Sequence, residues 1–137
     1  MSFRSVQRYI ILDAKAATGI GRIIDVRDFR NCVVKIGTAT SANLTCKAQG
    51  YVCSAATPDA IPDFAAAQTV ANNWDYIQMV DLQSGAAVDG DTGFVVTGTD
   101  DFRQFEINVN SLDYICFRVT ARSAGSVTVS CVVTDNQ

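Results

Sequence analysis

Apolar and polar residues alternate along most of this chain, and a period of two residues is typical of half-buried β-strands. In residues 31–38, for example, Cys32, Val34 and Ile36 share one face of a predicted strand. The same alternation recurs in residues 44–49, 102–109, 114–122 and 127–133. Turn residues separate these segments at intervals of about ten residues, which favours an antiparallel, jelly-roll-like β-sandwich. The predicted fold class is all-β, with an N-terminal arm or edge strand.

The connecting segments are less regular. Short polar segments at residues 38–43 and 123–126 predict hairpin loops between consecutive strands. Residues 74–83 predict one strand with apolar side chains on both faces, as expected of a central strand or of a strand covered by a partner.

Two further segments concern the organisation of the chain. Residues 53–73 contain both prolines and a run of alanines, and predict either a short helix near residues 64–71 or an irregular loop over the sheet. Residues 1–21 are predicted to form an N-terminal arm or edge segment, and residues 22–137 the β-sandwich domain.

The composition supports the all-β prediction. Of the 14 acidic residues, 13 are aspartates, which favour turns, and the chain has 16 valines and 12 threonines, which favour strands. The net charge of −3 argues against nucleic acid as a direct partner, because phosphate binding needs a basic surface. No apolar run approaches the roughly 18 residues of a membrane span. Asp13 and Lys15 interrupt the short apolar segment near the N-terminus, so we expect neither a signal peptide nor membrane binding.

Residues 88–101 carry the most suggestive chemistry, with four aspartates among glycines. Asp89 and Asp91 match the first positions of an EF-hand loop, but Gly93, Phe94 and Asp100 stand where that loop needs an oxygen ligand, a glycine and a glutamate. A looser calcium site, using these carboxylates and backbone carbonyls, stays open. The simpler interpretation is two turns, with Asp89-Gly90 as a type I′ turn and positive φ at Gly93 and Gly98.

Nothing in the sequence indicates an enzyme. The chain has no histidine, which excludes Ser-His and Cys-His nucleophile pairs, and it has no phosphate-binding glycine motif. The aspartates of residues 88–101 could form a glycosidase pair, but no other feature supports one. We therefore expect no catalytic residue, no cofactor and no metal.

The five cysteines have no metal-binding spacing. Four lie inside predicted strands, where a buried thiol behaves as a small apolar group: Cys32, Cys46, Cys116 and Cys131. Reduced thiols are the favoured interpretation, with a bridge such as Cys46–Cys53 as the alternative.

The sequence also carries the motifs WDYIQMVDL, DGDTG, FEINVN and VTARSAGSVTV. With them, residues 22–133 resemble small structural proteins of tailed bacteriophages, among them capsid decoration (auxiliary or cement) proteins. The resemblance implies a virion protein, made in the host cytoplasm, that binds the major capsid protein on the outside of the capsid. It also implies a homotrimer. A position in the tail or neck of the particle stays open.

The candidate interface residues are Arg4, Arg8, Tyr9, Ile10, Trp74 and Tyr76. The first four belong to an N-terminal segment that could dock on an acidic neighbour or add a strand to its sheet. The alternative function is a carbohydrate- or host-surface-binding domain of a tail or fibre, with Trp74, Tyr76 and residues 88–101 as its site.

Overall fold

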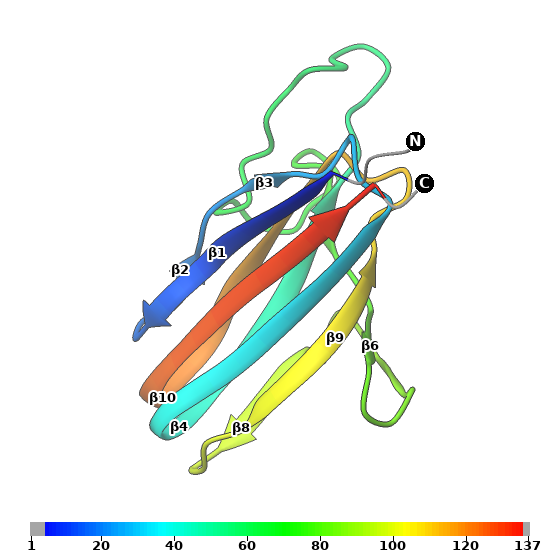
Figure 1. The fold of residues 1–137 in the computed structure, drawn as a ribbon. Coiled ribbons are helices and arrows are strands. Elements are labelled where there is room, and N and C mark those ends of the chain that lie inside the picture. The colour runs from blue at the N-terminus through cyan, green and yellow to red at the C-terminus, as the bar shows by residue number, and fades with distance from the viewer. Residues whose placement is uncertain (1–4, 136–137) are drawn as a thin grey trace.

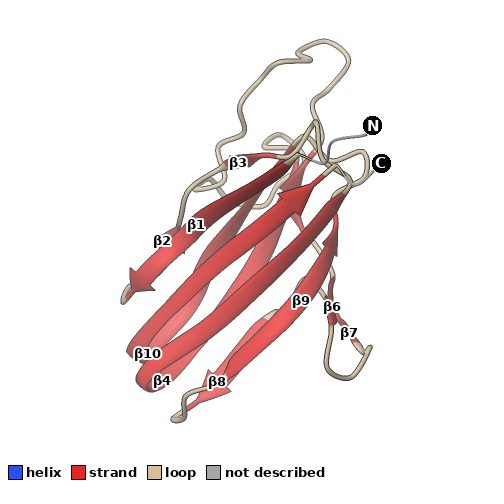
Figure 2. Cartoon of the chain, viewed as in Figure 1, coloured by secondary structure: helices blue, strands red, loops and turns tan. Residues whose placement is uncertain are grey.

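The computed structural model describes residues 5–135, and all regular secondary structure in this part of the chain is β-sheet (Figure 2). The strands are β1 (Val6–Lys15), β2 (Gly19–Ile20), β3 (Ile24–Asp25), β4 (Asn31–Tyr51), β5 (Trp74–Tyr76), β6 (Met79–Asp81), β7 (Ala87–Val88), β8 (Phe94–Thr97), β9 (Phe102–Asn108) and β10 (Tyr114–Thr134). Every pairing between them is antiparallel, which confirms the predicted class. The jelly-roll-like arrangement stays a prediction.

Two strands of 21 residues, β4 and β10, form the centre of the fold. They pair with each other along nearly their whole length, from Tyr114 opposite Tyr51 to Thr134 opposite Asn31. Both strands bend back at their midpoints, so each runs along one layer and returns along a second (Figure 1). One continuous sheet is thereby folded into two layers.

We call the layer with residues 31–39 of β4 and 126–134 of β10 the front layer, and the layer with the other halves the back layer. In the front layer, β1, β10, β4, β9, β6 and β7 lie side by side in that order. In the back layer, β2 and β3 pair with β10, while β5 and β8 pair with β4. The long strands thus carry a partner on each side in both layers.

The two midpoint bends replace the predicted hairpin loops. Thr40 and Ser41 have φ angles of 67° and 50°, and Gly125 has a φ of 75°, so the backbone turns sharply at both places. The hairpin predictions are wrong, because the two sides of each bend lie in different layers and pair with the other long strand. Residues 74–83 also divide between the layers, since β5 pairs with β4 and β6 pairs with β9. The prediction of one continuous strand there is wrong.

The core lies between the layers and is built from the inward positions of the strands. Cys32, Val34 and Ile36 are fully buried, as the alternation predicts. They face residues such as Phe117 and Val119 of the back layer, which are also fully buried. Within residues 5–135, no helix has the length and apolar character needed to cross a membrane.

The segment between β4 and β5 forms an irregular loop, not a helix, so the loop alternative is confirmed. This loop covers part of the outer side of the back layer. Its Phe64 is fully buried and makes edge-to-face contacts with Tyr51 and Trp74, at centroid distances of 6.4 and 6.1 Å. Gln49 Nε2 donates a hydrogen bond of 2.9 Å to the carbonyl oxygen of Phe64, which fixes the loop to β4. The loop therefore extends the hydrophobic core to the outer side of the back layer.

Candidate functional site

The first group of candidate residues lies on β1, at the edge of the front layer. Arg8 and Ile10 point outward, and Ile10 is 54% exposed. Tyr9 is half-buried, and the Arg22 guanidinium lies 5.0 Å from its ring centroid. Arg4 lies outside the described residues. Because β1 pairs with β10 on one side alone among residues 5–135, its other side over Val6–Ile10 is an open sheet edge.

The second group lies in the back layer, so the structure does not join it to the first. Trp74 is only 3% exposed, since the loop before β5 covers it, and it therefore offers little surface to a partner. Tyr76 is half-buried, with its ring at 84° to that of Trp74 and 5.0 Å away. Lys47 Nζ lies 4.9 Å from the Tyr76 ring centroid. The interface role of all six residues stays a prediction.

The turn that starts residues 88–101 lies against β5. A Cβ built on Gly90 would lie 2.7 Å from the backbone of Tyr76, so only glycine permits this approach. The predicted type I′ turn is wrong, because Gly90 has no positive φ. Instead, the amides of Thr92 and Gly93 donate to the Asp89 carbonyl, while the Asp91 amide donates to the Asp89 carboxylate. The positive φ values predicted for Gly93 and Gly98 are confirmed, at 68° and 70°.

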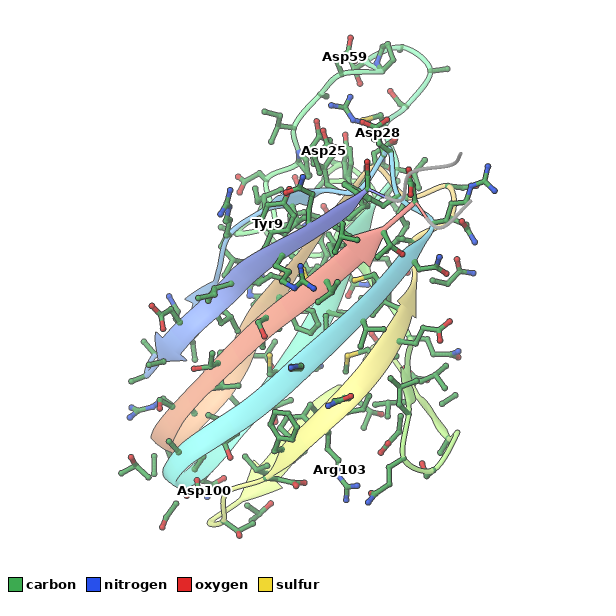
Figure 3. All side chains as sticks on the ribbon, viewed as in Figure 1. Tyr9, Asp25, Asp28, Asp59, Asp100 and Arg103 are labelled. Carbon is green, nitrogen blue, oxygen red and sulfur yellow. The ribbon has the colours of Figure 1, made fainter. Side chains whose placement is uncertain are left out.

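Asp100 and Asp101, at the end of residues 88–101, stabilise the bend of β4. Asp100 accepts hydrogen bonds from the amides of Ser41 and Ala42, at 3.2 and 3.1 Å. Thr38 Oγ1 accepts a bond of 2.9 Å from the Asp101 amide. These contacts hold the bend at the end of the molecule marked by Asp100 and Arg103 in Figure 3. Among residues 5–135, no cluster of three or more acidic or cysteine side chains is arranged to hold a metal ion.

A charged cluster lies at the opposite end of the molecule, where Figure 3 labels Asp25, Asp28 and Asp59. Arg27 binds the Asp25 carboxylate through Nε and Nη2, the latter at 2.7 Å, and reaches Asp59 at 3.4 Å. The hydrogen bond from Arg27 holds the pKa of Asp25 below its ordinary value. The cluster fixes the chain after β3.

All five cysteines are free thiols, so the alternative Cys46–Cys53 bridge is absent. The four in strands are buried, as predicted, and Cys53 is partly exposed. Burial raises the pKa of the Cys46 and Cys116 thiols, that of Cys116 to about 11. These thiols are therefore neutral packing groups and not nucleophiles at physiological pH.

The predicted site residues leave out most of the outer side of the front layer, which we call the front face. Arg8, Val132, Val33 and Glu106 lie in one row across β1, β10, β4 and β9, and Val80 continues the row on β6. The signal was present, because the two central valines occupy strand positions whose neighbours on both sides point into the core. A sheet face left to water is usually polar at such positions.

Comparisons with known proteins give fold relatives alone. No family model matches the sequence, and no curated protein matches it. The SPBc2 prophage-derived protein YomS superposes with a TM-score of 0.68 at 15% identity, covering 98% of this chain and 96% of that one. The chain shares the fold of a prophage-derived protein.

A second solved structure extends the likeness. The PBSX exported protein XepA superposes with a TM-score of 0.69 at 10% identity, covering 98% of this chain and 39% of XepA. A structure of infectious bursal disease virus, Gx strain, reaches a TM-score of only 0.44, which is too low to support an argument. The first two likenesses span nearly the whole chain, so the complete two-layer fold is shared with YomS and with part of XepA.

Proposed function

We propose that this chain is a non-enzymatic structural protein of a bacteriophage particle that binds the outer surface of the capsid and stabilises it. The observation that carries the proposal is the fold shared with YomS over 98% of this chain, since YomS derives from a prophage. The resemblance of the sequence motifs to capsid decoration proteins supports the same role. Fold alone does not fix function, so the capsid location needs a direct test.

The open edge of β1 is the docking element in this proposal. An extended segment of the major capsid protein can add a strand to such an edge, with backbone hydrogen bonds for affinity and side-chain contacts for specificity. Arg8 and Ile10 would contribute those side-chain contacts, because both are exposed beside the edge. Assembly as a homotrimer on the capsid, implied by the sequence resemblance, belongs to the same proposal.

Particles of the encoding phage, produced without this protein, provide the test. Purified chain should bind them saturably, appear as extra density on the capsid shell in electron microscopy, and raise the temperature at which the shell releases DNA. Ile10→Asp, beside the β1 edge, should weaken binding. Val33→Asp, on the same face but two strands from that edge, should not, and neither should Val95→Asp, because Val95 is equally exposed (53%) but lies in the back layer. Density on the tail or neck, or no binding to particles, would refute the capsid role.

A carbohydrate- or host-surface-binding domain of a tail or fibre is the second candidate. The observation in its favour is an open pocket of about 350 Å³ in the back layer, beside Tyr76, Arg118 and Thr120. An aromatic ring next to hydrogen-bonding side chains is the kind of surface that binds sugars. Saturable binding of the isolated protein to glycans, lost in Tyr76→Ala, would favour this function over the capsid role.

A further inference from the structure

The front face carries exposed and half-buried apolar side chains among polar and charged ones. Ile10, Leu82 and Phe102 are 54%, 46% and 57% exposed, and Val33 and Val132 are half-buried between them. The other side of this layer already faces the core, and no further layer of residues 5–135 covers these side chains. Several exposed apolar side chains on one face of a sheet indicate an interaction surface. We propose that the front face pairs with the front face of a second copy of this chain, about a two-fold axis parallel to the strands.

The charges of the central row indicate that the partner is a second copy. Arg8 stands at one end of the row, on β1, and Glu106 near the other, on β9, with Val132 and Val33 between them. Glu106 is the only glutamate of the chain, and both charged side chains are exposed. One end is therefore positive and the other negative, so the row is complementary to its own reverse.

This polarity also selects the symmetry axis. A two-fold axis parallel to the strands reverses the row, which places Arg8 of each copy opposite Glu106 of the other and Val132 opposite Val33. A two-fold axis parallel to the row would instead place Arg8 opposite Arg8 and Glu106 opposite Glu106, and like charges in contact are destabilising. The first arrangement is isologous and closes as a dimer.

The contacts of the neighbouring row are also compatible with a two-fold axis parallel to the strands. It consists of Ile10, Ser130, Lys35 and Gln104 on β1, β10, β4 and β9. Reversal places Lys35 opposite Ser130, which avoids a contact between two lysines and gives the ammonium group a hydroxyl partner. It also places Ile10 near Gln104, beside the exposed Leu82, whose amide donates a 3.0 Å hydrogen bond to the Gln104 carbonyl.

The face is large enough for a specific contact. Five strands spaced about 4.8 Å apart, with an average of about eight residues at about 3.3 Å per residue, make a face of about 600 Å². Two such faces bury about 1,200 Å², the lower end of the range for stable protein interfaces. Sheets also pack face to face readily, with their strands inclined by about 30°. The outer side of the back layer is less suited, because the loop with Phe64 covers part of it.

Sedimentation equilibrium of the purified chain at several concentrations tests the pairing. The native chain should have the mass of two copies at micromolar concentration. Arg8→Glu and Glu106→Arg should each weaken the dimer about tenfold or more, because each replaces two attractive contacts by repulsive ones. The double variant R8E/E106R should restore the native dissociation constant, since it exchanges the two charges without changing the pairing.

Apolar variants separate dimerisation from folding. Val33→Asp places an unpaired charge at the centre of the interface and should give a folded monomer, whereas Val95→Asp on the back layer should leave the dimer intact. Circular dichroism verifies that each variant is folded. A native chain that is monomeric at all concentrations overturns the proposal. So does an oligomer, of two, three or more copies, that none of the front-face variants weakens.

The pairing does not depend on capsid binding, because the measurement uses the isolated chain. A dimer that fails to bind particles would support the pairing and refute the proposed function. A monomer that binds particles would refute the pairing and support the proposed function. The pairing is an alternative to the homotrimer of the proposed function, in which each copy would use two different surfaces, and the mass of the isolated chain distinguishes the two.

Discussion

Gly125 of β10 packs directly on Ala42 of β4, where the two long strands bend from one layer to the other. A Cβ built on Gly125 would lie 2.5 Å from the Ala42 Cα and 2.6 Å from the Ala39 carbonyl oxygen. Gly125 also has a φ of 75°, a conformation that costs side-chain-bearing residues free energy. The bend of β10 can therefore pack closely against the bend of β4 because Gly125, at the point of closest approach, has no side chain.

Gly125→Ala should lower the free energy of unfolding by roughly 2–4 kcal/mol, since the new methyl group strains φ and collides with backbone atoms. Gly98→Ala is the matched control. Gly98 has a similar φ of 70°, but no atom lies within 4 Å of a Cβ built there. This variant should cost only about 1 kcal/mol. Urea denaturation measures the free energy of unfolding of both variants. Equal decreases would show that the close packing of the two bends does not contribute to stability.

Asp100→Ala should destabilise the fold by about 1–2 kcal/mol, because the amides of Ser41 and Ala42 lose their carboxylate acceptor. Asp91→Ala, in the same stretch, removes an exposed carboxylate and serves as the control. The measurement is the midpoint of thermal unfolding. A large rise of that midpoint with added calcium, abolished by both variants, would contradict the structural role and favour the calcium site.

Phe64→Ala should lower the free energy of unfolding by about 3 kcal/mol or more, because a fully buried ring is removed from between Tyr51 and Trp74. The loop should also become sensitive to limited proteolysis. Val70→Ala is the control, since Val70 is 98% exposed in the same loop. If Phe64→Ala leaves stability unchanged, the loop is not part of the folded core.

Asp25 should contribute to acid sensitivity. Its pKa is lowered in the folded protein by the hydrogen bond from Arg27, so its contribution to stability is present above its unfolded pKa and is lost as pH falls through the folded pKa. Native protein should therefore lose more stability than Arg27→Gln between about pH 5 and pH 2. The difference should be small, because the pair is exposed to solvent. Parallel denaturation curves for both proteins at all pH values would exclude this linkage.

Thiol labelling should separate Cys53 from the other four cysteines. Cys53 is the one that is not fully buried, so a thiol reagent should modify one group in the native protein and all five after denaturation. Labelling of Cys53 should itself be slow near neutral pH, since burial and the neighbouring Asp113 raise its pKa. Fast modification of Cys46 in the native state would show that the back layer opens.

The local alternation of the sequence predicted which strand positions are buried. It did not predict how the strands are arranged in two layers. The period of two in residues 31–38 gave the buried set Cys32, Val34 and Ile36 correctly. The same period of two continues through the bend of β4. A polar segment such as residues 38–43 predicts a hairpin in either case, whether the two flanking segments pair with each other or lie in different layers. Only the register with β10 distinguishes the two outcomes.

The candidate site was predictable only in part, for the same reason. Exposure of Arg8 and Ile10 follows from the pattern of one edge strand. Burial of Trp74 does not, because the residues that cover it come from an irregular loop with no periodicity. The central row could not be predicted either, since Arg8 and Glu106 are far apart in sequence and are placed in one row only by the pairing of the two strands between them.

The pairing of β1 with β10 has a consequence for how the protein folds. Val6 lies opposite Thr134, and the Ser5 amide donates a 3.0 Å hydrogen bond to the Asp135 carboxylate. During synthesis, β1 leaves the ribosome before β10, and its edge of the core stays uncovered until β10 is available to pair with it. Folds dominated by such distant contacts form slowly, and their unpaired strands are prone to aggregate in the meantime. We therefore expect folding of this domain to be completed only after β10 has left the ribosome, in a single late step that joins β1 to β10.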